Sequence, residues 1–267
     1  VYYSFDSGYT WTRSSLNNDL VNSLAVTGSA VYAGTELNGV FLSTDNGLNW
    51  SQLNDGLPGG ITIYSLYLYN NYVYAGASLN GVYRRPVIEF PVTLNQKVCI
   101  QGFYNPVSDA MVSDTLSVFL RNAASPYEII DFARALLDSS GYGSFQFTNA
   151  VNGVDYYIQL EHRNSLETWS NTPQQFTASV LDYDFTTANT QAYGDNMIQI
   201  NASPVRFGIY SGDVNQDGII DLNDVLMIYN DAIAFGSGYL VTDINGDSVV
   251  DLNDVIIAYN NSTGFVA

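Results

Sequence analysis

Basic side chains are scarce in this chain, and sulfur is scarcer still. Among 267 residues there are 8 Lys and Arg against 26 Asp and Glu, a formal net charge of −18. So acidic a chain repels the phosphate backbone of nucleic acids, and nucleic-acid binding is not expected. The single cysteine, Cys99, excludes an intrachain disulfide framework. The single histidine, His162, leaves too few ligands for a zinc site and is expected to be structural.

Long apolar runs are missing too. The chain has no run of about 18 or more apolar residues, so we expect no membrane-spanning helix. Apolar residues nevertheless make up 46% of the chain, which is enough for hydrophobic cores. The length has room for two or three domains. No signal peptide is recognisable and the chain begins at Val1, so we expect a processed product or a piece of a longer precursor.

Two acidic segments near the carboxyl end repeat each other. Residues 213–224 and 243–254 are offset by 30 positions (243 − 213). Each places oxygen-bearing side chains at positions 1, 3, 5, 9 and 12 of a twelve-residue loop and a backbone carbonyl at position 7, as Ca²⁺ requires. The predicted ligands of two Ca²⁺ ions are Asp213, Asn215, Asp217, Ile219, Asp221 and Asp224, and then Asp243, Asn245, Asp247, Val249, Asp251 and Asp254.

An acidic, solvated turn is the alternative interpretation, but two matched copies disfavour it. The loops depart from the EF-hand rule in two places: position 12 is Asp rather than Glu, and position 6 of the second loop is Ser248 rather than Gly. An apolar helical pattern follows each loop, and we expect the two helix faces to pack on each other. These faces consist of Leu222, Val225, Leu226 and Tyr229, and of Leu252, Val255, Ile256 and Tyr259.

Paired loops that end in Asp, each followed by one short helix, resemble a dockerin domain over about residues 209–267. The resemblance implies calcium-dependent attachment to a protein partner, which for dockerins is a cohesin. Cellulosomal dockerins usually carry small hydroxyl residues at loop positions 10 and 11. Here Leu222-Asn223 and Leu252-Asn253 occupy those positions, which departs from the pattern for ordinary cohesin binding.

The amino-terminal part contains a different repeat. Residues 4–11 (SFDSGYTW) align with residues 43–50 (STDNGLNW), and residues 33–41 align with residues 75–83. A period near 40 with alternating apolar residues predicts four-stranded propeller blades. The segments resemble the Asp-box of sialidase-like and sortilin-like propellers, in which the box forms a hairpin turn between the third and fourth strands and its Trp packs between sheets. Asp6 and Asp45 are therefore expected to be structural.

The phase of this repeat predicts about one and a half blades, and therefore an unpaired sheet edge. Residues 1–5 are predicted to form a strand that pairs with another copy of the chain. A head-to-tail contact of this kind does not close and gives a fibre.

The middle segment, residues 87–208, alternates apolar stretches with Gly, Asn and Pro turns. It predicts a sandwich of seven or eight strands, of immunoglobulin or prealbumin type. Its GxFxF strand followed by a Tyr-rich strand resembles carboxypeptidase-regulatory-like modules. Residues 161–170 resemble the carboxyl-terminal regions of secreted Bacteroidetes proteins.

Together these features predict a mainly β chain with three domains. Residues 1–86 form partial propeller-type blades, residues 87–208 a β-sandwich, and residues 209–267 a small helical, EF-hand-like calcium module. The predicted function is non-catalytic: an extracellular or cell-surface attachment protein that binds a cohesin-like partner or other copies of itself, in the sharper form as the subunit of a filament. The alternative is the attachment tail of a secreted sialidase-like or other glycoside hydrolase, for which Arg13, Arg84 and Arg85 are the candidate substrate-binding arginines.

Overall fold

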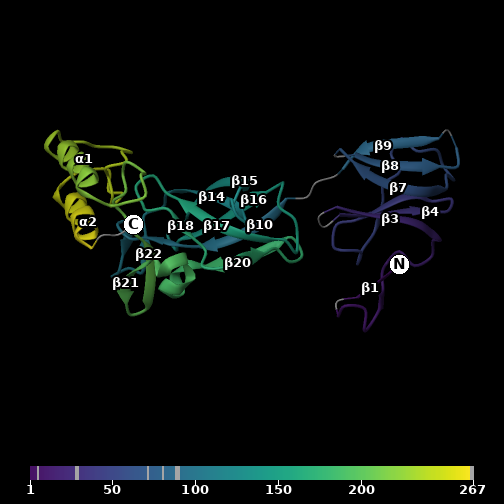
Figure 1. Ribbon diagram of the computed structural model, residues 1–267, viewed down its shortest axis with the longest axis horizontal. Coiled ribbons are helices and arrows are strands. Elements are labelled where there is room, and N and C mark those ends of the chain that lie inside the picture. The colour runs from purple at the N-terminus through teal and green to yellow at the C-terminus, as the bar shows by residue number, and fades with distance from the viewer. Residues whose placement is uncertain (5, 28–29, 71, 80, 88–90, 265–267) are drawn as a thin grey trace. The chain divides into compact units, whose positions relative to one another are not determined.

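The computed structural model describes residues 1–267 except residues 5, 28–29, 71, 80, 88–90 and 265–267 (Figure 1). The protein is mainly β, as predicted. It divides into two compact units, Val1–Pro91 and Val92–Ala267. The predicted sandwich and calcium segments therefore lie largely within one unit. In the described part of the chain no helix is long and apolar enough to cross a membrane.

The first unit consists of a hairpin and two antiparallel meanders. The hairpin pairs β1 (Tyr2–Tyr3) with β2 (Thr12–Arg13). The first meander is β3 (Val21–Thr27), β4 (Ala30–Thr35), β5 (Gly39–Ser43) and β6 (Ser51–Gln52), and the second is β7 (Ile63–Tyr69), β8 (Tyr72–Ala77) and β9 (Val82–Pro86). The register shifts at equivalent places, after Val21 and after Ile63, as expected of two blades of one repeat.

The Asp-box hairpins form at the predicted place and are held by their own side chains. The box between β5 and β6 uses Asp45, which accepts hydrogen bonds of 2.8 Å from the backbone N–H of Asn49 and the hydroxyl of Ser43. In the first box, hydrogen bonds from the hydroxyl and backbone N–H of Thr10 lower the pKa of Asp6 to about 2. Phe5, which belongs to this box and to the predicted strand of residues 1–5, lies outside the described residues.

The tryptophans of the boxes differ from the expectation that each packs between sheets. The Trp11 side chain is 63% exposed. The Trp50 side chain is half-buried, and its indole N–H donates a 2.8 Å hydrogen bond to the carbonyl of Gly47 in the same box. Trp50 therefore closes its own turn. The Trp11 side chain is not buried to a comparable extent.

The two blades share one hydrophobic core. Its most buried side chains are Tyr32 from β4 together with Ile61 and Ile63 at the start of the second blade. Gly34 is required where the blades approach, since a Cβ there would stand 2.6 Å from Cγ2 of Ile63. The close approach of backbone to side chain at this point fixes the distance between the sheets.

In the second unit, two sheets form a sandwich around the largest core. One sheet pairs β10 (Val92–Lys97) with β16 (Tyr142–Phe147) and, in parallel, with β20 (Val180–Asp184). The other consists of β15 (Ile129–Leu136), β14 (Thr115–Asn122), β17 (Asp155–Glu161) and β18 (Thr168–Trp169), and β19 (Gln174–Gln175) also pairs with β17. The core joins Leu94, Phe145 and Phe147 of the first sheet to Leu116, Val118, Leu120, Ile158 and Leu160 of the second.

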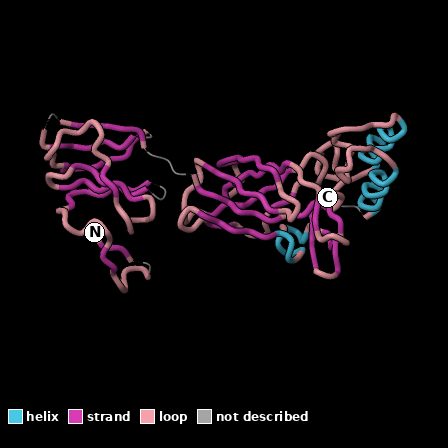
Figure 2. Tube along the Cα trace, turned by 180° about the vertical axis from the view of Figure 1, so that it is seen from behind, coloured by secondary structure: helices cyan, strands magenta, loops and turns pink. Residues whose placement is uncertain are grey.

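Short elements complete the sandwich end that faces the carboxyl-terminal helical module. A small sheet orders β11 (Cys99–Ile100), β22 (Val205–Ile209) and β21 (Ile198–Ala202), and β12 (Tyr104–Asn105) pairs with β13 (Ala110–Met111). Three 3-10 turns follow β20: η1 (Phe185–Thr187), η2 (Asn189–Gln191) and η3 (Tyr193–Asp195). Both α-helices lie together at one end of this unit (Figure 2).

The two helices, α1 (Leu222–Ile233) and α2 (Leu252–Thr263), begin at a capping box. In α1 the cap is Asp221, whose carboxylate accepts from the backbone N–H of Asn223. The predicted packing of the helix faces is wrong in part. Val225 is buried, but the other members of the predicted faces are half-buried or exposed: Val255 is half-buried, and Leu222, Leu226, Tyr229, Leu252, Ile256 and Tyr259 are exposed. The physical reason is that Val214, Ile244 and Val250 from the loops fill the module core, against Val225, Ile228 and Ala258.

The contact at Gly34 gives a first prediction. Gly34→Ala places a methyl group against Ile63, and overpacking of this kind costs about 1–3 kcal/mol. We expect a lower thermal-unfolding midpoint of the first unit, measured by circular dichroism of the full chain. Gly59→Ala is the matched control, because a Cβ at Gly59 meets nothing within 4 Å. Equal midpoints for both variants would show that Gly34 does not set the blade spacing.

Candidate metal centre

The two predicted calcium loops fold as copies of each other. In the first, the carboxylate of Asp213 accepts backbone N–H bonds of 3.2 Å from Asp217 and Gly218. In the second, Asp243 accepts from Gly246 at 2.9 Å and Ser248 at 3.2 Å. The aspartate at position 1 therefore organises the turn in each loop by the same means.

Positions 3 and 5 repeat this correspondence. The side-chain oxygen of Asn215 accepts from the N–H of Asp217 at 2.8 Å, and Asp217 accepts from Ile219 at 3.1 Å. In the second loop Asn245 accepts from Asp247 at 2.8 Å, and Asp247 accepts from Val249 at 2.9 Å. The side chains of Ile219 and Val249 are about half exposed, while their backbone occupies position 7.

Each loop contains two residues with positive φ, and one of the two is glycine. The first loop has Gln216 at φ 57° and Gly218 at φ 86°, whereas the second has Gly246 at φ 74° and Ser248 at φ 70°. Ser248 thus takes the left-handed conformation that the loop demands at position 6. For a residue with a Cβ this conformation costs about 1 kcal/mol or more.

The aspartate at position 12 is buried and connects the two ends of its loop. Asp224 accepts from the backbone N–H groups of Val214 at 2.9 Å, Asn215 at 3.2 Å and Asp221 at 3.0 Å. Asp254 repeats this pattern with the N–H groups of Ile244 at 2.8 Å, Asn245 at 3.1 Å and Asp251 at 2.9 Å. The carboxylate that closes the helix cap therefore also fixes the start of the loop.

Positions 1 and 12 place two buried carboxylates in each small loop. Burial raises the pKa of Asp213 to about 6, and the nearby Asp224 contributes to the rise. Burial also raises the pKa of Asp254. Among the described residues, no three His, Cys, Asp or Glu side chains stand close enough to hold a metal ion. The donor set itself, carboxylate and amide oxygens with one backbone carbonyl, is the kind that suits Ca²⁺.

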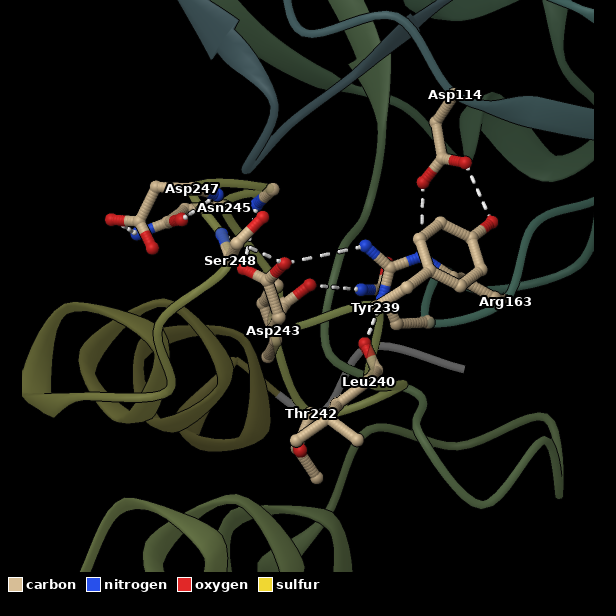
Figure 3. A network of polar contacts seen from close by, with 12 residues as sticks. Asp114, Arg163, Tyr239, Leu240, Thr242, Asp243, Asn245, Asp247 and Ser248 are labelled. Atoms are coloured by element: carbon tan, nitrogen blue, oxygen red, sulfur yellow. Dashed lines mark hydrogen bonds and ion pairs between the residues drawn. The ribbon is translucent and has the colours of Figure 1, made fainter. Parts of the chain in front are cut away.

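A polar network joins the second loop to the sandwich through Arg163, which follows β17 (Figure 3). Its Nε donates to the Oδ2 of Asp114 at 2.9 Å, and its Nη2 lies 3.6 Å from the Oδ2 of Asp243. It also donates to the carbonyl of Leu240. The guanidinium carbon lies 4.3 Å from the ring centre of Tyr239, whose hydroxyl donates to Asp114 at 2.6 Å.

Asp114, the centre of this network, is ionised despite its burial. Burial acts to raise the pKa of Asp114, but hydrogen bonds from His162, Tyr239 and Arg163 lower it well below the usual carboxyl range. Sequence reasoning identified neither Asp114 nor Arg163, because the residues that meet here are distant in the chain and carry no motif. The chain has only 8 Lys and Arg, but nothing in the sequence indicates which acidic residue each of them meets.

His162 connects Asp114 to a serine. Its Nε2 lies 3.2 Å from Asp114, and its Nδ1 lies 3.1 Å from the hydroxyl of Ser165. Burial lowers the pKa of His162. The three side chains form an Asp–His–Ser series, but Ser165 is 0% exposed and His162 is 2% exposed. In this structure the Ser165 hydroxyl is closed off from solvent, and the series makes its hydrogen bonds inside the fold.

Comparisons with known proteins give no family for this chain. No family model matches it, and no curated protein matches it. Two solved cohesin–X–dockerin type II complexes from Acetivibrio cellulolyticus are similar. The C-terminal interface mutant shows 19% identity over 65% of this chain and 99% of that chain, with a TM-score of 0.38. The N-terminal interface mutant shows 21% identity over 66% and 97%, with a TM-score of 0.34.

A third solved structure, YCF48 bound to a D1 peptide, shows 15% identity over 64% of this chain and 72% of that chain. Its TM-score is 0.24. The TM-scores of all three structures are low, so these similarities do not assign the chain to a fold family.

The buried carboxylates give a prediction about pH. Because the folded-state pKa of Asp213 is about 6, above its ordinary 3.8, the folded chain keeps a proton that the unfolded chain releases. This contribution to stability is complete below about pH 4 and is lost as the pH rises through about 6. His162, whose pKa is lowered by burial, acts in the opposite direction over the same pH range. In a chelator, we therefore expect the melting temperature of the natural chain to gain more, or lose less, than that of Asp213→Asn between about pH 7 and about pH 5.

With Ca²⁺ present the melting temperature should be higher at about pH 7 than at about pH 5, since protons and Ca²⁺ compete for the same oxygens. Differential scanning calorimetry of the full chain at both pH values, with and without Ca²⁺, measures the two trends. Asp213→Asn removes the titrating carboxylate. The melting temperature in chelator should then lack the contribution of this group to its pH dependence. Identical pH dependence of the melting temperature in the natural chain and in Asp213→Asn, both in chelator, would contradict the assignment.

Proposed function

We propose that the chain is a non-catalytic, calcium-stabilised attachment protein that works outside the cell. The observation that carries this proposal is the duplicated loop, with two buried carboxylates at positions 1 and 12 in each copy. The carboxylate at position 12 accepts the same three backbone N–H bonds in both copies, and the carboxylate at position 1 accepts two in each. A divalent cation neutralises carboxylates that otherwise repel at close range. The residues that would hold Ca²⁺ are the twelve predicted ones, and bound Ca²⁺ would supply folding free energy to the module.

The partner would bind on the outer surface of the two helices. Each helix and the loop before it carry exposed apolar side chains at equivalent positions: Ile219, Leu222, Leu226 and Tyr229, and Val249, Leu252, Ile256 and Tyr259. Each of these side chains is about half exposed or more. Tyr229 of the first set and Val249 and Leu252 of the second line one cavity of about 350 Å³. Exposed apolar side chains gathered on one face mark protein-binding sites. The helices therefore favour a protein partner, either a cohesin-like protein or another copy of the chain.

The first unit supports assembly in a different way. In the part of the chain that the structure describes, the first blade has β6 as its fourth strand, whereas the sheet of the second blade ends at β9. A sheet that ends at an open edge can take a strand from another molecule. Strand addition between copies would give the filament form of the proposal.

The alternative of a sialidase-like tail finds less support in the arginines. Arg84 and Arg85 are consecutive on β9, so their side chains point to opposite faces of the sheet. Arg84 lies over the ring of Tyr72 at 4.9 Å, and Arg13 donates to the carbonyl of Asn17. Buried Ser165 likewise supports a non-catalytic role.

Calcium binding is tested on the full chain by isothermal titration calorimetry and far-ultraviolet circular dichroism. We expect two Ca²⁺ ions to bind and the helical signal to fall when a chelator removes them. Asp224→Asn and Asp254→Asn should each weaken one site by about tenfold or more, because position 12 can contribute both carboxylate oxygens.

Asp6→Ala is the control for those two variants. It removes a carboxylate that binds only its own hairpin, so it should lower the melting temperature of the first unit and leave Ca²⁺ binding unchanged. If Ca²⁺ gives no binding heat in calorimetry and no change in circular dichroism, the calcium interpretation is refuted.

Self-association through the helices is tested by sedimentation velocity of the full chain in millimolar Ca²⁺. We expect species larger than the monomer, which Leu226→Gln combined with Ile256→Gln should reduce. Val107→Gln is the matched control, because Val107 is 95% exposed and lies on the sandwich. A plain monomer at high concentration would exclude other copies as the partner and leave a different protein in that role.

A further inference from the structure

We infer that the sandwich makes the two calcium loops unequal. Arg163 acts as a fixed positive charge beside the second loop, while Glu161 and Glu167 add negative charge beside the first, so the first loop binds Ca²⁺ more tightly. This inference rests on the proposed function, since it takes both loops as Ca²⁺ sites. It goes further in stating which loop fills first and which residues outside the loops decide that order.

The loops themselves offer little basis for a difference. Both begin with a buried Asp that accepts two backbone N–H bonds, and both end with a buried Asp that accepts three. Both are followed by a helix with the same capping box. Their ligand types agree at every predicted position. A difference in affinity must therefore come mainly from what surrounds the loops.

The second loop lies against the sandwich, and a cation is fixed there. Arg163 is 3.6 Å from the first ligand, Asp243, and its side chain is only 11% exposed. It cannot turn away easily, because Asp114 and the ring of Tyr239 hold the guanidinium from the other side. The amide of Asn164 also donates to the backbone carbonyl of Asp243 at 2.8 Å. Arg163 therefore places a positive charge directly against Asp243, partly offset by the ionised Asp114 on its other side, and this charge repels the ion.

The ligands of the first loop face the opposite kind of neighbour, although a cavity of about 330 Å³ also brings Arg134 and Arg163 near Gln216 at position 4 of this loop. A cavity of about 450 Å³ opens beside the ligands. The described residues that line this cavity are Glu161, Leu166, Glu167, Asp213, Gln216, Asp217 and Gly218, with no Lys or Arg among them. Two glutamates of the sandwich thus share a cavity with the ligands Asp213 and Asp217. Negative charge near a divalent cation strengthens its binding, and the effect falls with salt where the groups are exposed.

The charge on the ion makes the difference measurable. Interaction energy scales with the product of the charges, so a fixed unit charge affects Ca²⁺ twice as strongly as a monovalent ion. Arg163 weakens Ca²⁺ binding at the second loop, and the two glutamates strengthen it at the first. Both effects raise the affinity of the first loop relative to that of the second. We expect the first loop to bind Ca²⁺ at least tenfold more tightly, a difference of about 1.4 kcal/mol.

The test uses the full chain and isothermal titration calorimetry with Ca²⁺ alone. Asp254→Asn weakens the second site and reports on the first, and Asp224→Asn does the reverse. Arg163→Gln should tighten the second site several-fold and change the first much less, because its direct ligand contact is with Asp243. Arg163→Lys keeps the positive charge, so its second site should stay weak.

Glu167→Gln keeps the experiment decisive if loss of Arg163 disturbs the fold, because Glu167 is exposed. It should weaken the first site and leave the second unchanged, and low salt should enlarge the effect. Glu128→Gln is the matched control: it removes the same charge from an exposed residue of the sandwich that does not line the cavity. It should change neither site.

The outcomes separate this inference from the proposed function. Two sites of unequal affinity, shifted as stated by Arg163→Gln and Glu167→Gln, support the inference. Two sites of equal affinity, or sites that do not respond to these variants, would overturn it and leave the calcium module intact. A chain that binds no Ca²⁺ would overturn both.

Discussion

Buried carboxylates are the constraint on which the second unit depends. Its fully buried aspartates are Asp114, Asp213, Asp224, Asp243 and Asp254. A buried charge is costly unless hydrogen bonds or an opposite charge compensate it. Asp114 is compensated by an arginine, a tyrosine hydroxyl and a histidine. Asp213, Asp224 and Asp254 rely on backbone N–H groups, and Asp243 has both N–H groups and the arginine.

This constraint connects the sandwich to the carboxyl-terminal helical module. Arg163, just after β17, places a cation beside the buried carboxylate of Asp243, and Asp114, just before β14, keeps that cation in place. Packing adds to this connection: Gly102 lies so close to the second loop that a Cβ there would stand 2.3 Å from the carbonyl oxygen of Ile244. The junction is thus built from charge compensation and close backbone contact together.

Local features of the fold could be predicted from the sequence, whereas features that depend on distant partners could not. The twelve-residue loops, the helices after them and the repeat of the blades all rest on short-range patterns. The helix faces were predicted incorrectly, because periodicity marks an apolar stripe without saying whether loop residues already fill the core. Trp11 and Trp50 have the same place in the Asp-box, yet Trp11 is exposed and Trp50 is half-buried, because the residues packed around each box differ. The network of Asp114, Arg163 and Asp243 lay beyond the sequence, since its members are far apart and belong to no motif.

Repetition in sequence therefore does not mean equivalence in structure, and both repeats of this chain illustrate the point. The blades have matched registers, but Leu42 is buried in the first while Arg84, its counterpart 42 residues later, lies over Tyr72 on the second. The loops have matched hydrogen bonds, but only the second has a buried arginine at its first ligand among the described contacts. In each case the duplicated segment determines the backbone conformation and its hydrogen bonds. The rest of the molecule determines the charge and burial around it. Because cation affinity and surface chemistry depend on charge and burial, the function of each copy is decided outside the copy itself.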